Sequence, residues 1–288
     1  MTAAPEPARV TLVPVPELPE VETVRLRLAP AVVGRRLEQV EIRDSRLTRP
    51  EDPLVVAAEL LGERVAALER RGKYLIFRFE SGRGLLVHLR MTGGFRLAAG
   101  NGLPDDPYVR AVVTLDDGSD VAYRDVRRFG TWQLLEPHEV EPFLSARLGE
   151  EPLGRRFTVR ALGERLAGRR APVKAALLDQ RTIAGMGNIY VDEALWRARI
   201  HPLRPGGELD RDEVKRLHRA VRRALEAGLA RQGATIRNYA TPDGEEGAMQ
   251  HEFKVYGRAG EPCPRCRTPI EKTRAGGRGT WYCPSCQR

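Results

Sequence analysis

The chain has 288 residues, which favours more than one domain, and its composition of 41% hydrophobic and 30% charged residues excludes a wholly disordered protein. No run approaches the roughly 18 consecutive apolar residues of a membrane-spanning helix, so none is expected. The 48 basic and 39 acidic side chains leave a net charge of +9, which favours a polyanionic partner, although a general preference for arginine explains part of it.

The first half of the sequence is rich in predicted strands. Residues 1–15 contain many Pro and Ala residues and show no usable period. Helical spacing predicts helices over Val21–Leu28 and Pro53–Leu61. Alternating apolar residues predict strands at Leu37–Ile42, Val65–Leu68, Tyr74–Phe79, Leu85–Leu89, Val109–Leu115, Val121–Tyr123 and Thr131–Leu135. Many short strands separated by Gly, Asp and Ser clusters favour a β-sandwich or a barrel.

The second half of the sequence is predicted to be helical. It follows a linker-like segment, Gly149–Gly154. Apolar residues three and four apart predict helices at Val159–Leu166, Val173–Leu178, Ile189–Arg197 and Asp210–Arg231. Asp210 and Glu213 form a capping-box pattern at the start of the last helix.

All four cysteines lie near the end of the chain in two C-x2-C pairs, Cys263 with Cys266 and Cys283 with Cys286. No secretory signal is visible, so we expect a cytoplasmic protein with reduced thiols. Four thiolates at this spacing predict one structural Zn²⁺ in a closed tetrahedral site. The alternative is two redox-active pairs, which the lack of a thioredoxin-like context disfavours.

The segment Pro16–Thr23 (PELPEVET) resembles the N-terminus of formamidopyrimidine-DNA glycosylases (Fpg), which excise oxidised purines from DNA. The resemblance runs in order from Pro16 to Gln287, through Lys73-Tyr74, His88–Gly93, Asp125–Gly130, Leu178–Gln180, Ala184–Tyr190, Asp192–Leu195, Ile200–Pro202 and Val255–Gly257. It implies an α+β multidomain fold with an N-terminal β-sandwich and flanking helices, a helix-two-turn-helix domain and a C-terminal zinc ribbon with four cysteine ligands.

The same resemblance implies a domain organisation and a partner. A non-native leader covers residues 1–15, and a catalytic β-sandwich domain covers 16–148. A helix-two-turn-helix domain with a lesion-capping loop covers 149–250, and a DNA-binding zinc-ribbon hairpin covers 251–288. The expected partner is double-stranded DNA containing an oxidised base. We expect a nucleoid-associated monomer with no membrane contact and no small-molecule cofactor.

In this family the N-terminal proline is the nucleophile, which here corresponds to Pro16. Its secondary amine attacks the sugar C1′ and forms an iminium, and an α-amino group, with a pKa near ~8, is partly neutral at cellular pH. An internal proline nitrogen is a tertiary amide without a basic lone pair. We therefore hypothesise that translation starts at the Val15 codon and that removal of the initiator exposes Pro16. Glu17 is the implied acid/base partner, whereas Glu20 is interpreted as a charge favoured at a helix N-terminus.

Other residues are assigned to DNA by the resemblance. Lys73 is expected to contact a phosphate and assist proton transfer, and Arg278 to reach the phosphates and the catalytic centre. Asn188 is expected to join them on phosphate, as are the backbone amides that follow Gly185-Met-Gly187. Lys174 is implied near the damaged base, with a surface helical lysine as the alternative.

A further group is expected to act while the target nucleotide is extruded. Met91 and Phe129 are suited to wedging between bases, and Arg127 to facing the orphaned base. Arg128 is expected nearby on phosphate. Tyr239 belongs to a loop between Thr235 and Tyr256 that is implied to close over the flipped purine.

Two departures from the family pattern stand out. Pro104–Val109 has no histidine where relatives carry a histidine-rich turn, and Arg267 replaces a usual glycine after Cys266. Two rival functions also remain: an endonuclease VIII-like enzyme for oxidised pyrimidines, and a non-catalytic damage-binding protein if the leader is retained.

Overall fold

The computed structural model describes residues 15–98, 105–236 and 239–288. The predicted leader, apart from Val15, lies outside the described residues, as do Arg237 and Asn238 of the expected capping loop. In the described part of the chain, no helix is long and apolar enough to cross a membrane.

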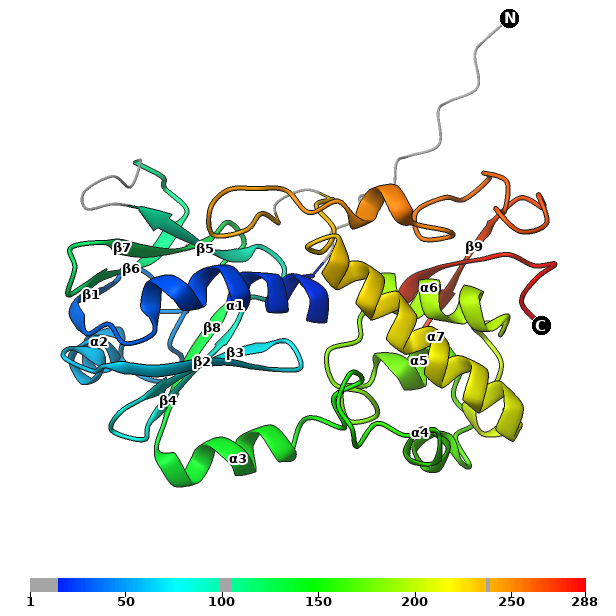
Figure 1. Ribbon diagram of the computed structural model, residues 1–288, viewed down its shortest axis with the longest axis horizontal. Coiled ribbons are helices and arrows are strands. Elements are labelled where there is room, and N and C mark those ends of the chain that lie inside the picture. Colours follow the sequence, from blue (N-terminus) through cyan, green and yellow to red (C-terminus); the bar gives the residue numbers. More distant parts are fainter. Residues whose placement is uncertain (1–14, 99–104, 237–238) are drawn as a thin grey trace, which may run out of the picture.

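The N-terminal half is a sandwich of two antiparallel four-stranded sheets (Figure 1). One sheet has the order β1 (Leu37–Ile42), β6 (Val109–Leu115), β7 (Asp120–Asp125) and β5 (Gly93–Ala98). The other has the order β2 (Val65–Arg71), β3 (Tyr74–Phe79), β4 (Gly84–His88) and β8 (Thr131–Leu135). Apolar residues from both sheets and from α1 (Leu18–Val32) and α2 (Pro53–Leu60) form one buried core. A second, smaller cluster lies beneath α3 (Pro137–Ser145).

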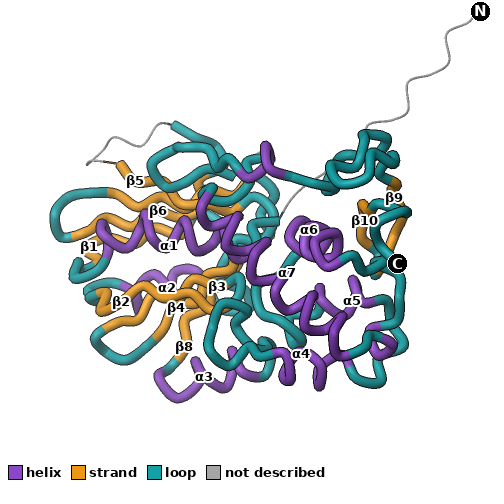
Figure 2. Tube along the Cα trace, turned by 45° about the vertical axis from the view of Figure 1, so that its right-hand side comes forward, coloured by secondary structure: helices purple, strands orange, loops and turns teal. Residues whose placement is uncertain are grey.

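The C-terminal half is helical and ends in a hairpin (Figure 2). Its helices are α4 (Val159–Leu166), α5 (Val173–Leu178), α6 (Asn188–Ala198) and α7 (Arg211–Ala230), with short 3-10 turns at Gly206–Glu208 and Met249–Glu252. The hairpin pairs β9 (Glu271–Ala275) with β10 (Arg278–Tyr282). Trp281 and Ile270 of the zinc ribbon are buried in the same core as α5, α6 and α7. The ribbon is therefore anchored on the helices by a shared apolar core.

Helix α1 joins the two halves. Its first residue, Leu18, is buried in the helical core, whereas Val21, Val24 and Leu28 are buried in the sandwich core. The helix begins at Leu18, three residues before the predicted start, because Glu17 and Glu20 form a capping box and Pro19 occupies the first turn. The residues just before α1 are thus placed between the two halves.

The fold class predicted from the resemblance is confirmed, and most elements lie within a few residues of their predicted bounds. The predicted capping box is present, with Glu213 N–H donating to Asp210 at 2.7 Å. Two elements were not predicted. Strand β5 begins with Gly93-Gly94, and Gly93 is needed because a Cβ there would lie 2.2 Å from the Tyr123 hydroxyl oxygen. Helix α3 contains two prolines, one of which starts it.

Candidate active site

A cavity of about 640 Å³ lies where the start of α1, the β-sandwich, α6 and the zinc-ribbon hairpin meet. Several sequence-predicted residues line it together with residues that were not singled out. The lining residues are Val15, Glu17, Lys73, His88, Arg90, Met91, Phe129, Leu178, Gln180, Gly187, Asn188, Tyr256 and Arg278. Pro16 lies between two of these lining residues and is buried. Residues far apart in sequence are thus gathered around the predicted nucleophile.

The carboxylate of Glu17 is seated on the N-terminus of α6. It accepts hydrogen bonds from the backbone N–H groups of Ile189 at 2.9 Å and Tyr190 at 3.3 Å. Gly187, the N-cap of α6, leaves room for it, because a Cβ there would lie 2.2 Å from the Glu17 carboxyl carbon. Burial raises the pKa of Glu17 to about 7, although Lys73 and the two amides oppose the rise. A carboxyl group with this pKa can both give and take a proton near neutral pH.

The seat of Glu17 corrects one expectation about phosphate binding. The amides at the start of α6 were expected to bind a DNA phosphate, but two of them are already bonded to the Glu17 carboxylate. A helix N-terminus attracts any anion, and the carboxylate lies closer. The glycine-flanked start of α6 therefore positions the acid/base residue.

Lys73 and Arg278 supply positive charge to the cavity. Lys73 follows the β2–β3 turn, and burial lowers its pKa while Glu17 and Glu20 oppose the change. Arg278 begins β10 and is exposed, so its guanidinium is available at the cavity rim. The ammonium and guanidinium groups face the buried carboxyl of Glu17, which suits a site for a phosphodiester beside a proton-transfer group.

Glu20 does more than the predicted helix-end charge. Its buried carboxylate accepts hydrogen bonds from the Glu17 N–H at 2.9 Å, the Tyr190 hydroxyl at 2.8 Å and the Ala234 N–H at 2.8 Å. It therefore ties the active-site backbone to α6 and to the segment after α7. The sequence does not indicate that Glu20, and not Glu17 or Glu22, makes these bonds, because all three glutamates lie in the same short segment.

Tyr239 does not line the cavity in this structure. Its hydroxyl donates to the carbonyl oxygen of Gln232 at 3.0 Å and lies 3.3 Å from that of Glu20. Its ring packs against the sandwich core. The expected contact between this aromatic ring and a flipped base is thus not formed in the free protein, because the backbone carbonyls hold the hydroxyl inward.

Met91 and Phe129 lie at the cavity, and Arg127 lies beside them. The Arg127 guanidinium is 4.8 Å from the centre of the Phe129 ring, and Phe129 is 49% exposed. The Asp125 carboxylate fixes this tip by accepting from the N–H groups of Arg127 and Gly130. An exposed aromatic ring beside an arginine agrees with the predicted wedge and base-facing pair, whose contact with DNA stays a prediction.

Arg128 has a carboxylate partner within the protein. Its guanidinium makes two hydrogen bonds to the Asp44 carboxylate, at 2.5 and 2.8 Å, and Asp44 is almost fully buried. The same contact lowers the pKa of Asp44 to about 2. Arg128 is therefore paired within the protein, but its side chain is 40% exposed, so its contact with a phosphate stays a prediction.

Lys174 is buried beneath the cavity. Its ammonium group is 2.7 Å from the Asp192 carboxylate and donates to the Gly279 carbonyl at 2.8 Å, and both charged side chains are fully buried. The expected contact near the damaged base is not available, because no part of Lys174 reaches the surface. The Asn188 amide donates to the same Gly279 carbonyl at 3.0 Å but does line the cavity. Both residues hold the β10 strand that begins with Arg278.

Several lining residues, among them His88, Gln180 and Tyr256, were present in the quoted motifs without being chosen as site residues. Burial lowers the pKa of His88 to about 3, so its ring is neutral, and its Nδ1 accepts from the Arg90 N–H at 3.0 Å. Gln180 bonds the Met186 carbonyl and the Gly185 N–H, and so shapes the loop before α6. Tyr256 is fixed by a buried glutamate, Glu193, which accepts from its N–H at 3.1 Å. Only their presence in the motifs that carry the family resemblance could have predicted that these residues line the cavity.

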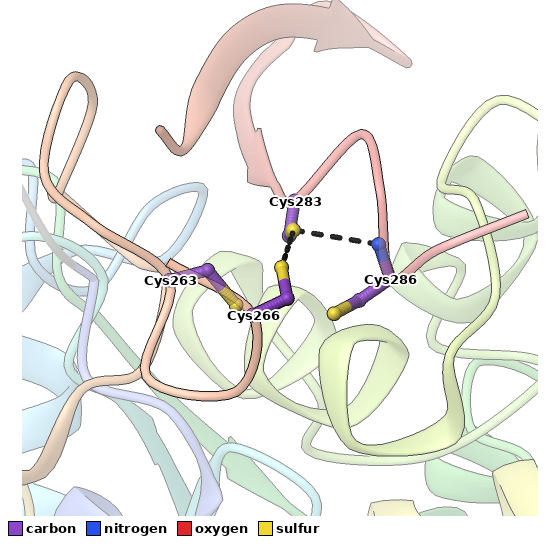
Figure 3. A group of neighbouring side chains, drawn as sticks. All are labelled: Cys263, Cys266, Cys283 and Cys286. Atoms are coloured by element: carbon purple, nitrogen blue, oxygen red, sulfur yellow. Dashed lines mark hydrogen bonds between the residues drawn. The ribbon is translucent and has the colours of Figure 1, made fainter. Parts of the chain in front are cut away.

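The four cysteines form a compact cluster at the base of the hairpin (Figure 3). Their sulfur atoms all lie within 4.8 Å of one another, and tetrahedral Zn²⁺ with Zn–S bonds of about 2.3 Å needs sulfur atoms ~3.8 Å apart. The Trp196 indole N–H and the Arg265 backbone N–H point at the Cys263 sulfur, as they would at a thiolate. The cluster therefore fits the predicted structural Zn²⁺. Arg267, the departure from glycine, adopts a left-handed φ of 68° in this knuckle.

Comparison with known proteins gives consistent matches along the chain. Residues 15–132 match the model of the formamidopyrimidine-DNA glycosylase N-terminal domain, 148–240 match its H2TH domain, and 260–288 match the zinc finger found in FPG and IleRS. The formamidopyrimidine-DNA glycosylase of Symbiobacterium thermophilum is 50% identical over 273 residues, covering 94% of this chain and 89% of the relative. That of Geobacillus kaustophilus is 47% identical, covering 95% and 100% respectively.

Solved structures match equally well. A variant of Lactococcus lactis Fpg in complex with DNA containing Fapy-dG superposes with a TM-score of 0.89 at 38% identity, covering 95% of this chain and 100% of that one. The complex of Lactococcus lactis Fpg with DNA containing an abasic site gives a TM-score of 0.87 at 37% identity, covering 94% and 99%. Together with the three matched domains, these similarities show that the chain belongs to the formamidopyrimidine-DNA glycosylase family.

Proposed function

We propose that this protein removes oxidised purines, such as 8-oxoguanine and formamidopyrimidines, from double-stranded DNA and then cleaves the strand as an AP lyase. The observation that carries the proposal is the placement of Glu17 on the α6 N-terminus, next to Pro16, in a cavity shared with Lys73 and Arg278. The relatives named above carry the glycosylase name, and one was solved with Fapy-dG in its DNA. Chromosomal DNA in the cytoplasm is the proposed substrate.

The proposed reaction begins at the nitrogen of Pro16. Its lone pair attacks C1′ of the damaged nucleotide, and the bond from C1′ to the base breaks with its electron pair going to the base. The Pro16 nitrogen then loses its proton, which balances the proton that the departing base takes up. Glu17 in its protonated form can give a proton to the sugar ring oxygen, which opens the ring and leaves an iminium between Pro16 and C1′. β-Elimination then removes a proton from C2′ and breaks the bond to the 3′ oxygen, and δ-elimination removes a proton from C4′ and breaks the bond to the 5′ oxygen.

The remaining cavity residues are proposed to hold the DNA in place. Lys73, Arg278 and Asn188 would bind phosphates around the lesion, with Lys73 also assisting proton transfer. Zn²⁺ would act through structure alone, because it fixes the hairpin that carries Arg278. Met91 and Phe129 would fill the space left by the extruded nucleotide, and Arg127 would hydrogen-bond the orphaned base.

The reaction requires Pro16 to be the first residue. In the chain as written, the Pro16 nitrogen is joined to the Val15 carbonyl, so its lone pair is delocalised and cannot attack C1′. We therefore propose that the active form begins at Pro16, through initiation at the Val15 codon and removal of the initiator. Mass measurement on active native protein checks this. An active chain whose mass includes residues 1–15 would refute it.

Borohydride trapping tests the proposed activity. Protein beginning at Pro16 is mixed with a duplex containing 8-oxoguanine, and borohydride reduces the iminium to a stable protein–DNA adduct. We expect an adduct with this form and none with the form that retains residues 1–15. The Glu17→Gln variant should form the adduct far more slowly. No adduct from the Pro16 form would leave the non-catalytic damage-binding function as the better explanation.

One comparison keeps the pyrimidine alternative open. A complex of Lactococcus lactis Fpg with DNA containing an oxidised pyrimidine matches this chain with a TM-score of 0.87. Trapping with a thymine glycol duplex measured beside 8-oxoguanine decides between the two classes. We expect faster trapping with 8-oxoguanine, and the opposite order would favour the endonuclease VIII-like function.

A further inference from the structure

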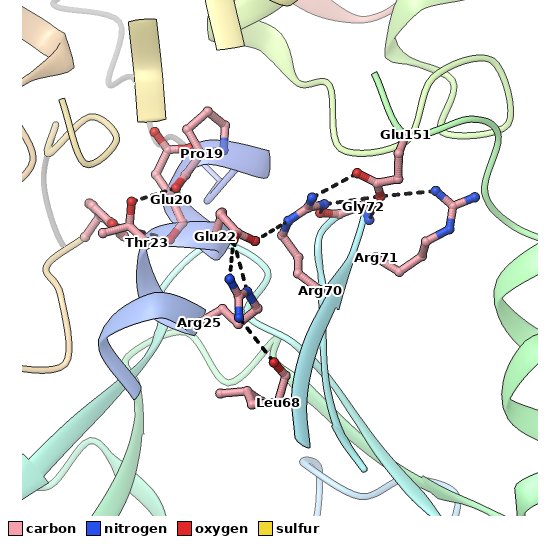
Figure 4. Close-up of polar contacts among 11 residues, drawn as sticks. Pro19, Glu20, Glu22, Thr23, Arg25, Leu68, Arg70, Arg71, Gly72 and Glu151 are labelled. Carbon is pink, nitrogen blue, oxygen red and sulfur yellow. Dashed lines mark hydrogen bonds and ion pairs between the residues drawn. The ribbon is translucent and has the colours of Figure 1, made fainter. Parts of the chain in front are cut away.

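A charged network joins the β-sandwich to the segment that leads into the helical half (Figure 4). The Arg70 guanidinium lies between two carboxylates, with its Nε 2.8 Å from Glu22 of α1 and one terminal nitrogen 2.9 Å from Glu151. The Arg71 guanidinium is 3.1 Å from Glu151 as well. Arg70 is only 11% exposed, so the network is shielded from solvent more than an ordinary surface ion pair.

Two side chains of the network bond the backbone of Gly72. Arg70 donates to the Gly72 carbonyl at 3.0 Å, and the Oε1 of Glu151 accepts a hydrogen bond from the Gly72 N–H at 2.5 Å. Gly72 forms the β2–β3 turn with φ of 58°, and the next residue is Lys73 of the cavity. The carboxylate therefore fixes the backbone immediately before the active-site lysine.

The two residues before Glu151 are bonded to the loop that leads into α6. Gly149 N–H donates to the Gln180 carbonyl at 2.8 Å, and Ala184 N–H donates to the Glu150 carbonyl at 3.1 Å. This loop continues into Gly187 and the α6 amides that hold Glu17. A short chain of bonded groups thus runs from the seat of Glu17, through Glu151, to the turn before Lys73.

We propose that Glu151 is a positioning residue that sets Lys73 relative to Glu17 by bonding the β2–β3 turn to the linker of the helical half. The proposal rests on the proposed glycosylase function and extends it. Lys73 belongs to the sandwich, whereas the amides that hold Glu17 belong to the helical half, so their relative position depends on how the halves are joined. Glu151 supplies that joint beside the lysine itself.

The main test compares Glu151→Ala, which removes both the charge and the acceptor for Gly72, with two matched controls, all in the form that begins at Pro16. Glu150→Ala removes the same charge one residue away, where the carboxylate pairs with the exposed Arg156. Glu22→Ala removes the other carboxylate from Arg70 but leaves the Gly72 contact. Because displacement of a reacting group by about 1 Å can cost ~10²-fold, we expect E151A to slow single-turnover excision at least ~10-fold. Both controls should stay within about twofold of the unaltered protein.

A second measurement follows Lys73 without using activity. The chain has five lysines, so reductive methylation with ¹³C-formaldehyde, on a separate sample, gives few resonances, and Lys73→Arg identifies that of Lys73. The charged or titratable groups near Lys73 are Glu17, Glu20, Arg278, Arg90 and the neutral ring of His88. Loss of the negative charge of Glu151 would by itself lower the pKa of Lys73. Release of the turn into solvent would raise it, because burial is what lowers it.

The two measurements together decide the proposal. We expect the titration midpoint of Lys73 to move up in E151A and to stay in place in E150A and E22A. An unchanged or lower midpoint, or an excision rate equal to those of the controls, would overturn the positioning role. If the unaltered protein forms no borohydride adduct, the proposed function fails, and the Lys73 midpoint alone then decides whether Glu151 positions the lysine. Thermal unfolding of each variant shows whether it folds.

Discussion

Replacement of Gly187 by alanine tests the seat of Glu17 directly. Gly187 has an ordinary extended φ of −140°, so alanine introduces no backbone strain there. The added Cβ would lie 2.2 Å from the Glu17 carboxyl carbon and 2.5 Å from its Oε1. These distances are far inside van der Waals contact, so the carboxylate must leave the α6 amides. The backbone of Gly187 is held by the helix that follows, which makes movement of the Glu17 side chain the easier adjustment.

The size of the effect follows from what Glu17 loses. Two hydrogen bonds from the amides of Ile189 and Tyr190 to a charged group contribute roughly 1.5–3 kcal/mol each, and water in the cavity replaces part of this. We expect G187A to lower the free energy of unfolding by about 2 kcal/mol. A positioned acid/base group contributes typically 10²–10⁴-fold to a rate, so excision should fall by about 10²-fold. DNA affinity should change little, because Lys73 and Arg278 keep their places.

Single-turnover excision measured across pH is the assay, with Gly94→Ala as the matched control. Gly94 lies on β5, and a Cβ there meets nothing within 4 Å. In G187A the carboxylate reaches solvent, so its pKa falls from about 7 toward 4.5, and the limb of the pH profile due to Glu17 moves to lower pH. A G187A protein with the rate and pH profile of G94A would refute the reasoning, because Glu17 would then act without its seat on α6.

Three further outcomes follow from buried charge and backbone strain. Lys174→Met leaves Asp192 buried and unpaired, so it should destabilise the protein by about 3–5 kcal/mol in urea unfolding, and the double variant K174M/D192N should recover most of that loss. Arg267→Gly relieves a left-handed backbone and should stabilise the zinc-loaded protein by about 1 kcal/mol. Glu17 has a pKa raised from 4.5 to about 7, so the folded protein binds the extra proton and loses stability as pH rises between these values. Glu17→Gln should remove this loss, which is of the order of 3 kcal/mol, from unfolding curves measured across that range.

Each of these outcomes can fail clearly. If K174M alone unfolds like the unaltered protein, Asp192 does not need its partner. If R267G lowers the melting temperature, the arginine side chain contributes more than its backbone costs. If E17Q shows the same loss of stability between pH 4.5 and 7, another buried carboxyl, such as Asp192 with its pKa of about 7, is responsible.

The sequence predicted which residue types form the site better than it predicted the groups to which they are hydrogen-bonded. The four cysteines form the predicted cluster, and Glu17 and Phe129 line one cavity, whereas the roles predicted for the site residues stay predictions. A motif fixes an identity and a place along the chain. It does not say which neighbouring group takes up a hydrogen-bonding capacity, because that depends on contacts between residues far apart in sequence.

Lys174 and the start of α6 show this limit in physical terms. A lysine at the second position of a predicted helix is compatible with the surface or the interior, and the partner Asp192, one helix later, offsets the free-energy cost of burying its charge. The α6 amides were predicted to bind a phosphate, but two of them bind the carboxylate of Glu17, located 172 residues away. Sequence periodicity reports on one element at a time, whereas both outcomes are decided between elements.

The two neighbouring arginines at the tip show that contacts between distant residues also decide the orientation of charged side chains. Arg127 and Arg128 are chemically alike, yet Arg128 adopts a left-handed φ of 60° and turns its guanidinium to the buried Asp44, while Arg127 lies over Phe129. Successive side chains at such a turn point in different directions. The bonds that hold Arg128 on Asp44 therefore also limit the direction of the Arg127 side chain. Asp44, which is 84 residues away, therefore determines which of the two arginines the tip presents beside its exposed aromatic ring. The net charge of +9 counts both arginines equally, and the fold separates them into one that is paired with Asp44 and one that lies over the exposed ring, for which contact with a base stays a prediction.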